Sequence, residues 1–277
     1  MKRIRLLIGV VFLFASCGDD QENAFPVESI NQNGTRLVRL VSHNDDYPNA
    51  IYTMRYYYLG NMLYKFTGND GNSSNDLTLI YTYSGNRIAK IESFNYNNSK
   101  MRETLFTYNG AGDLIHETRY ELADTEFSYT WNSSNILTRQ AYFVDDDNQT
   151  HYGNKQRFAF NNNEVVNKWS EVDNIARDSV HETITYDAHN SPMKNVPGYD
   201  KVVYFHPWRE FFYFGNQQNV LTSSSVIYYN GNQSIQNMVF AYTYNSFGYP
   251  MSCRLQFVSN DTGEIVDTPY RMEYYYE

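Results

Sequence analysis

The chain has 277 residues and a formal net charge of −9, and it contains 27 tyrosines but only 19% charged residues. An acidic chain without basic clusters is a poor nucleic-acid binder, so we expect no nucleic-acid partner. The negative mean hydropathy of −0.61 excludes a helical membrane protein, and 17% aromatic residues argue against disorder. This composition is typical of a β-rich chain with wide aromatic faces.

The first 17 residues have the features of a bacterial export signal. Lys2, Arg3 and Arg5 precede an apolar run that is too short to span a membrane. Residues 14–17, Phe-Ala-Ser-Cys, resemble the lipobox of bacterial lipoproteins, which implies acylation of Cys17 and a partner in outer-membrane lipid. The alternative is an ordinary signal peptide with an unrelated cysteine.

An acidic cluster follows Cys17 directly. Asp19, Asp20 and Glu22 resemble the surface-export signal of Bacteroidetes lipoproteins, which implies an outer-membrane protein that faces outward from the cell. The alternative is a solvated tether, and residues 18–34 are expected to form such a polar tether in either case. Residues 35–277 then make a single β domain.

From about residue 50 the chain repeats one unit. In residues 77–97, Leu77, Leu79, Tyr81 and Tyr83 fall on one side of an extended chain, with Thr78, Ile80 and Thr82 on the other. A Ser-Gly-Asn turn follows, and a return strand begins at Arg87. The second aromatic of each unit recurs every 23 to 32 residues, at Tyr58, Tyr83, Tyr108, Trp131, Phe160, Tyr186, Phe214, Tyr244 and Tyr276. Self-similarity of this kind indicates an array of identical hairpins.

The repeat predicts the fold class. Two strands per unit give an all-β, antiparallel, up-and-down meander of about 14–18 strands. A sheet of that size must curl or close, so we expect a strongly curved sheet or a wide open barrel with an aromatic inner layer. A membrane-spanning barrel is the rival, but the return strands place charge on both faces, which favours a sheet tethered by lipid.

Some repeat units resemble a known family. Residues 185–193, Thr-Tyr-Asp-Ala-His-Asn-Ser-Pro-Met, resemble the YD repeat of bacterial Rhs proteins, and residues 83–88 and 244–251 are similar. Most copies carry Asn or Ser in place of the Asp. The chain from about residue 50 is still more similar to short, uncharacterised Bacteroidetes lipoproteins with a porin-like fold. This resemblance implies an extended meander and no known activity.

No catalytic, cofactor or metal motif is complete, so no cofactor is expected. His116-Glu117 and His181-Glu182 lack the second histidine of a zinc protease, and adjacent strand residues point to opposite faces. The acidic run 145–147 has oxygens suited to calcium, but its spacing matches no calcium loop, so a solvated turn is expected.

Two single residues are worth recording. Cys253 is the only cysteine besides Cys17, and a buried inert thiol is expected there. Ser179, in Asp-Ser-Val, resembles the acceptor of O-glycosylation in Bacteroidetes, and a plain loop is the alternative.

The predicted function is non-enzymatic binding of a glycan or a protein partner at the cell surface. The region 195–214 is dense in aromatics that could stack on a sugar ring, with Tyr204, His206, Trp208 and Phe212 as candidates. Packing of these side chains in the core is the alternative. Two other functions stay open: a structural partner of an outer-membrane assembly, and a hydrolase with two carboxylates about 5–10 Å apart in a pocket.

Overall fold

The computed structural model describes residues 35–49, 51–69, 76–121, 125–145, 147–171, 179–202, 214–229 and 232–277. Two sets of predicted site residues lie outside these ranges. The first is the anchor and export signal, Cys17, Asp19, Asp20 and Glu22. The second is the predicted stacking set, Tyr204, His206, Trp208 and Phe212.

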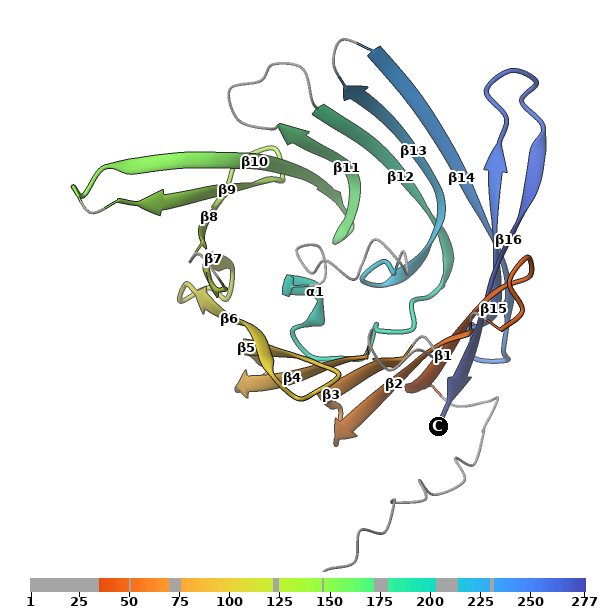
Figure 1. Cartoon of the computed structure of the whole chain (residues 1–277), viewed down its shortest axis with the longest axis horizontal. Helices are drawn as coiled ribbons and strands as arrows, with labels where there is room; N and C mark the ends of the chain where they lie inside the picture. Colours follow the sequence, from red (N-terminus) through yellow and green to blue (C-terminus); the bar gives the residue numbers. More distant parts are fainter. Residues whose placement is uncertain are drawn as a thin grey trace, which may run out of the picture.

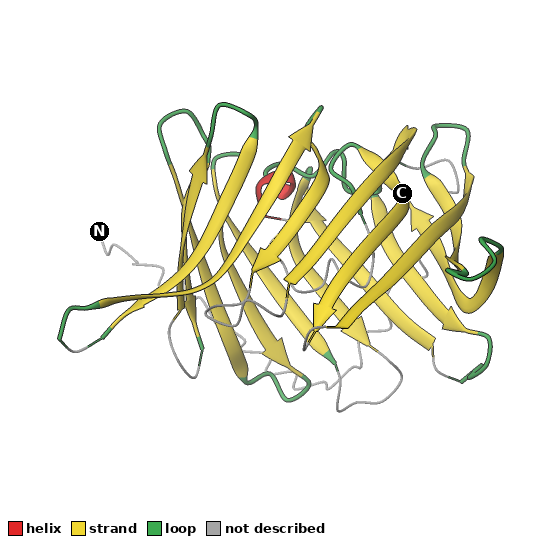
Figure 2. Cartoon of the chain, turned by 90° about the horizontal axis from the view of Figure 1, so that it is seen from above, coloured by secondary structure: helices red, strands yellow, loops and turns green. Residues whose placement is uncertain are grey.

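Within the described residues, sixteen antiparallel strands follow one another in sequence order, and β16 pairs with β1 to close a barrel (Figures 1 and 2). The all-β meander is therefore confirmed, and it closes. The strands are β1 Leu37–Asn44, β2 Ile51–Leu59, β3 Met62–Asn69, β4 Leu77–Ser84, β5 Arg87–Asn95, β6 Lys100–Tyr108, β7 Leu114–Tyr120, β8 Thr125–Trp131, β9 Ile136–Val144, β10 Thr150–Asn161, β11 Glu164–Glu171, β12 Ser179–Asn190, β13 Gln218–Tyr229, β14 Asn232–Tyr244, β15 Pro250–Val258 and β16 Ile265–Tyr276.

A β-bulge recurs at the second aromatic of the repeat. Tyr58 pairs with Leu63 although Tyr57 pairs with Lys65, so one residue of the return strand is skipped. The same shift occurs in the hairpins β4–β5, β6–β7, β10–β11 and β14–β15, and where β12 meets β13. A bulge increases the local twist, and its repetition around the sheet favours closure.

The sequence-based repeat was wrong at one unit. A return strand was expected near Met193, but Tyr186 pairs with Val220, and an inserted segment separates β12 from β13. Met193 is buried in the core, and Phe214 forms only an isolated bridge with Asn219. Pro192 and Pro197 lie in the insertion, and proline cannot donate to a strand ladder.

The insertion carries the short helix α1, Tyr199–Val202, into the interior of the barrel (Figures 1 and 2). Val202 is buried, and α1 contacts β5. Gly198, just before the helix, has φ of +69°, and a Cβ there would lie 2.9 Å from the backbone oxygen of Asn86. Glycine therefore allows the insertion to pack against the turn between β4 and β5.

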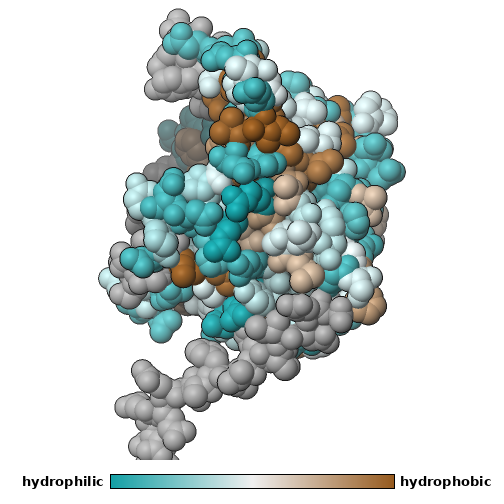
Figure 3. Space-filling model, turned by 90° about the vertical axis from the view of Figure 1, so that its right-hand side faces the viewer, coloured by the Kyte–Doolittle hydropathy of each residue, from teal (hydrophilic) through white to brown (hydrophobic). Residues whose placement is uncertain are grey.

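The two faces of the barrel wall differ in chemistry. Tyr81 and Ile91 are paired and buried on the inner face, so Lys90 and Glu92 point outward, where their charged groups lie 2.8 Å apart. On the side formed by β14–β16, hydrophilic residues separate the apolar ones into patches (Figure 3). Among the described residues, no helix is long and apolar enough to cross a membrane.

Candidate functional site

The second tyrosine of a repeat unit joins neighbouring hairpins on the inner face. In the preceding unit, the second aromatic pairs with a residue on the next strand. The tyrosine hydroxyl donates to the backbone carbonyl of that residue, and we call this bond a tyrosine clasp. Within the described residues, four clasps are formed, from Tyr58 to Leu37 (2.8 Å), Tyr108 to Ile88 (2.7 Å), Tyr186 to Val165 (2.7 Å) and Tyr276 to Pro250 (2.8 Å). The Tyr244 hydroxyl donates to Asp187 Oδ2 instead. Leu37 itself pairs with Tyr276, so one of the four clasps lies at the closing seam.

Two consecutive units cannot form a clasp, because Trp131 and Phe160 replace the tyrosine. The carbonyls that a clasp would reach there belong to Leu114 and Leu137, which pair with Tyr108 and Trp131. The Trp131 and Phe160 rings instead pack against each other, with centroids 5.1 Å apart. Trp131 keeps 42% of its surface exposed, whereas Phe158 on the same wall is fully buried.

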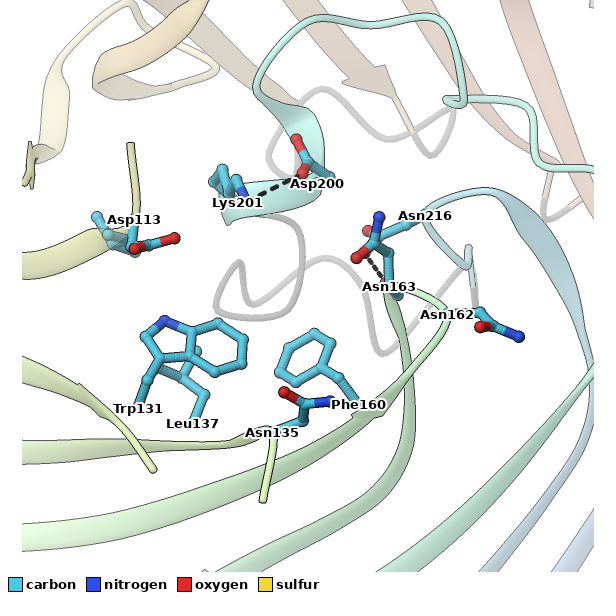
Figure 4. Close-up of a pocket in the computed structure, with 11 residues that line it drawn as sticks. Asp113, Trp131, Asn135, Leu137, Phe160, Asn162, Asn163, Asp200, Lys201 and Asn216 are labelled. Carbon is cyan, nitrogen blue, oxygen red and sulfur yellow. Dashed lines mark hydrogen bonds and ion pairs between the residues drawn. The ribbon is translucent and has the colours of Figure 1, made fainter. Parts of the chain in front are cut away.

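A cavity of about 200 Å³ lies at this position, between α1 and the ends of the short turns (Figure 4). We call it the luminal cavity. It combines an aromatic floor, two leucines and a set of carboxylate, amide and ammonium groups. Its described lining is Asp113, Leu114, Trp131, Asn135, Leu137, Phe160, Asn162, Asn163, Asp200, Lys201 and Asn216.

Asn216 lines this cavity, and its amide oxygen is buried. Its side chain is 5% exposed, and its Oδ1 is buried without a hydrogen-bond partner in the described part of the chain. Its Nδ2 donates to the Asn163 carbonyl at 2.6 Å, and its backbone N–H donates to Glu164 Oε2 at 2.8 Å. The Nδ2 bond fixes the amide orientation, because a flipped amide would place two oxygens together.

Glu164 holds the residues that follow the insertion. Its buried carboxylate accepts backbone N–H groups from Asn216, Gln217 and Gln218 at 2.5–2.8 Å. Gly215 lies so close that a Cβ there would be 2.1 Å from the Gln218 oxygen. The backbone beside the cavity is therefore fixed by a buried anion and a glycine.

Two carboxylates and one ammonium group line the cavity. Asp113 Oδ2 accepts from Asn109 Nδ2 at 3.2 Å, within the turn between β6 and β7. Asp200 and Lys201, both on α1, form an ion pair of 3.5 Å. The two carboxylates come from different elements, Asp113 from the barrel wall and Asp200 from α1 in the insertion (Figure 4).

A charge cluster lies on the inner face of the same strands. We call Glu117, Arg119, Tyr129, Arg139 and Gln156 the inner charged cluster. Glu117 is fully buried and accepts from Arg119 Nε, from the Tyr129 hydroxyl and from Arg139 Nη2, the last at 3.2 Å. Burial opposes ionisation of this carboxyl, but Arg139 and Arg119 outweigh that effect and hold the pKa of Glu117 below its ordinary value.

The cluster also supports the aromatic floor of the luminal cavity. Tyr129 precedes Trp131 by two residues on β8, so both side chains lie on the inner face. Arg139 Nη1 donates to Gln156 Oε1 at 3.0 Å, which ties β9 to β10. The strands that carry Trp131 and Phe160 are thus joined by charged side chains rather than by tyrosine clasps.

A second cavity, of about 530 Å³, lies at the closing seam and is lined by Thr35, Arg36, Tyr58, Asn61, Pro192, Asn195, Val196 and Glu277. Its charged groups already have partners, since Arg36 donates to the Gly60 carbonyl and pairs with Glu277. Among its described lining residues, the one aromatic ring belongs to Tyr58, whose hydroxyl forms a clasp. This cavity has less to offer a ligand than the first.

In both histidine–glutamate pairs the two side chains point to opposite faces of the sheet, as predicted for adjacent residues of a strand. Glu117 points inward, while His116 on the outer face contacts Thr118 Oγ1 at 3.1 Å. Glu182 accepts from Ser223 Oγ at 2.7 Å, and His181 stacks on Trp169. Neither pair can place both side chains around one metal ion. No group of three or more His, Cys, Asp or Glu residues suited to a metal occurs in the described ranges.

The other residues singled out in the sequence lie in a turn, in the core and at a strand end. Asp145 Oδ1 accepts the backbone N–H groups of Asp147 and Gln149, so this part of the acidic run serves as a turn. Cys253 is buried, and burial raises the pKa of its thiol to about 12. Ser179 is the first residue of β12 and pairs with Glu171 and Tyr228, so it lies at a strand end rather than in a loop.

The sequence did not reveal the luminal cavity. Its lining comes from three separate turns, from strand ends and from α1, and only the closed fold brings these together. One signal was present: two consecutive repeat units depart from tyrosine at the second aromatic, at Trp131 and Phe160.

No family model and no curated protein matches the chain. Solved structures do. A porin-like protein from Bacteroides uniformis ATCC 8492 aligns over 87% of this chain and 98% of its own, with a TM-score of 0.54 and 13% identity. A porin-like protein from Bacteroides vulgatus ATCC 8482 aligns over 88% and 99%, with a TM-score of 0.51 and 14% identity. At these identities the chain shares the fold of porin-like proteins, a barrel consistent with an outer-membrane location.

Proposed function

We propose that this protein is a lipid-anchored, non-enzymatic binding protein of the outer membrane that holds one sugar ring in the luminal cavity. The observation that carries the proposal is Trp131, a large aromatic side chain that stays 42% exposed beside Phe160 inside a polar cavity. Elsewhere on the inner face, the second tyrosines at 58, 108, 186 and 276 are used in clasps.

The chemistry of the cavity fits a saccharide. A sugar ring has a flat C–H face that packs on an aromatic ring and hydroxyls that need hydrogen-bond partners. Trp131 supplies the first, and Asp113 and Asn163 are placed for the second. A volume of about 200 Å³ is below the ~300–1,000 Å³ typical of drug-sized ligands, so a single ring is the suitable occupant.

The outer wall supports anchoring by lipid rather than by the barrel itself. Lys90 pairs with Glu92, Arg157 with Glu171, and Arg271 with Glu273, all on outward-facing strand positions. Each Arg or Lys on a lipid-facing wall would cost about 2–4 kcal/mol at the bilayer midplane. Acylated Cys17 and the following acidic residues, Asp19, Asp20 and Glu22, would then hold the domain at the cell surface.

Ligand binding is tested by tryptophan fluorescence. A screen of the full chain in detergent against a glycan array should yield a saccharide that quenches the emission of Trp131. Trp131→Ala removes this fluorophore, so affinities of the variants are measured by calorimetric titration, and this variant should bind the saccharide about tenfold or more weakly, which corresponds to about 1.4 kcal/mol. The matched control is Trp169→Ala, since Trp169 stacks on His181 on the outer face. Equal affinity in both variants would contradict the proposal.

Anchoring is tested separately. Cys17→Ser should abolish incorporation of labelled palmitate and release the protein from the membrane fraction. Protease added to intact cells should digest the wild-type protein if it faces outward. Palmitate labelling that persists in Cys17→Ser would remove the anchor from the proposal and leave the binding site untouched.

A hydrolase is the second candidate, because Asp113 and Asp200 line the same cavity. Hydrolysis of a glycosidic bond needs one carboxyl as acid and the other as base or nucleophile. Asp200 is paired with Lys201 and is partly exposed, which suits an acceptor better than a general acid. Release of reducing sugar by the wild-type protein, lost in both Asp113→Asn and Asp200→Asn, would favour the hydrolase.

A further inference from the structure

The carboxylates of the luminal cavity outnumber the cations in its described lining. Two carboxylates line it, those of Asp113 and Asp200. The one cation in its described lining, Lys201, already lies 3.5 Å from Asp200. The described lining thus carries one more negative than positive charge, so a positive charge on the ligand would be favoured over a negative one.

The aromatic floor has the same preference. The faces of Trp131 and Phe160 carry the negative part of the ring quadrupole, which attracts a cation placed over them. Their rings meet at 5.1 Å with an interplanar angle of 43°, so the two faces form an angled surface rather than a flat stack. A protonated amine above this surface would lie between the aromatic rings and the Asp113 carboxylate (Figure 4).

From this geometry we infer that the luminal cavity selects an amino sugar with a free, protonated amine over the matching neutral sugar, and that it rejects uronic acids. The inference rests on the proposed function and adds the class of sugar. The amine would donate to Asp113, while the ring packs on Trp131. A uronic acid would bring its carboxylate against Asp113 and Asp200, and like charges in a partly closed cavity repel.

The test compares three soluble probes, glucosamine, glucose and glucuronic acid, by calorimetric titration of the full chain in detergent at pH 6. We expect glucosamine to bind at least tenfold more tightly than glucose, and glucuronic acid to give no measurable heat. Raising the ionic strength should reduce the preference for glucosamine, because it depends on charge.

Two variants assign the preference to the cavity. Asp113→Asn should bring the ratio of glucosamine to glucose affinities from at least ten to near one. If that variant does not fold, Asp200→Asn on α1 serves instead, since it leaves Lys201 uncompensated and should also lower the ratio. Asp145→Asn is the matched control, because Asp145 caps a distant turn, and it should keep the wild-type ratio.

The outcomes distinguish the amino-sugar inference from the sugar-binding function on which it rests. Equal affinity for glucosamine and glucose would overturn the amino-sugar inference and leave a sugar-binding function intact. Tighter binding of glucuronic acid would overturn it as well. Failure of all three probes, together with an empty glycan array, would count against the sugar-binding function itself.

Discussion

Two sectors of the barrel are built from the same repeat but are stabilised differently. In the clasped sector, β15, β16, β1 and β2, tyrosine clasps join the hairpins and the inner face is apolar, with Leu40, Met54, Cys253 and Met272 buried. In the open sector, β7 to β10, clasps are absent and the inner charged cluster joins the strands. The luminal cavity lies in the open sector.

The difference suggests how a repeated hairpin acquires a binding site. A clasp places the tyrosine hydroxyl on a backbone carbonyl and leaves the ring packed against its neighbours. Trp131 and Phe160 stand in place of tyrosine in adjacent units, so their rings lack that bond, pack against each other and line the luminal cavity. The lost hydrogen bonds are offset by a buried network in which Arg139 on β9 donates to Glu117 on β7 and to the Tyr129 hydroxyl on β8.

The largest expected effect comes from breaking that network. Glu117→Ala should lower the free energy of unfolding by about 3–5 kcal/mol, because it leaves Arg119 and Arg139 buried without their anion. Urea unfolding measures the loss. Glu92→Ala on the outer face is the control and should cost less than about 1 kcal/mol. Similar losses in the two variants would show that the cluster adds no special stability to the open sector.

Lowering the pH should destabilise the open sector before the rest of the barrel. The folded-state pKa of Glu117 lies below its ordinary value of 4.5, so its stabilising contribution is complete above that value. The contribution is lost as the pH falls below 4.5 toward the folded-state pKa. In urea unfolding, the difference between wild type and Glu117→Gln should therefore shrink below pH 4.5. A difference that stays constant down to pH 3 would exclude this carboxyl as the source.

Each clasp is expected to contribute about 1 kcal/mol, the usual net value of a hydrogen bond. Tyr58→Phe and Tyr276→Phe remove only the hydroxyl and should each lower the free energy of unfolding by about that amount, with no change in ligand affinity. Tyr57→Phe is the control, since Tyr57 points outward beside Tyr58. If the clasp variants lose no more stability than the control, the clasps do not distinguish the two sectors.

The smallest change would convert the open sector toward the clasped one. Phe160→Tyr restores the tyrosine of the repeat, and its hydroxyl would donate to the Leu137 carbonyl to form a clasp. We expect a gain of up to about 1 kcal/mol in unfolding free energy and a several-fold weaker sugar affinity, because the ring is drawn onto the wall. Thermal unfolding and fluorescence titration measure the two effects. If neither the unfolding free energy nor the sugar affinity changes, the missing clasp does not explain the cavity.

Local patterns predicted most of the fold. The alternation in residues 79–83 and the turn at Gly85 placed β4 and β5 within a residue or two of their bounds. Closure was left open between a curved sheet and a barrel, because it depends on pairing Leu37 with Tyr276, and neither segment reveals its distant partner. The unit assigned to Phe214 was wrong because the spacing of aromatics in an insertion imitates a strand.

The sequence predicted a type of ligand contact but not the residues that line the cavity. Aromatic stacking on a sugar was expected, but the candidates Tyr204 to Phe212 lie outside the described residues. The cavity that the structure does describe depends on Asp113, Asn163 and Asp200, which come from two turns and α1. Such residues have no spacing rule in the sequence, because closure of the barrel and the path of the insertion decide which turns meet.

The seam between β1 and β16 has a further consequence for topology. The backbone N–H of Thr35 donates to the Glu277 carbonyl at 3.2 Å, so the two ends of the barrel's chain touch. A short linker from residue 277 to residue 35 would turn the domain into a ring of hairpins with no preferred starting point. New termini cut into the turn at Gly85 should then yield the same barrel, a circular permutant in which every strand keeps both of its neighbours.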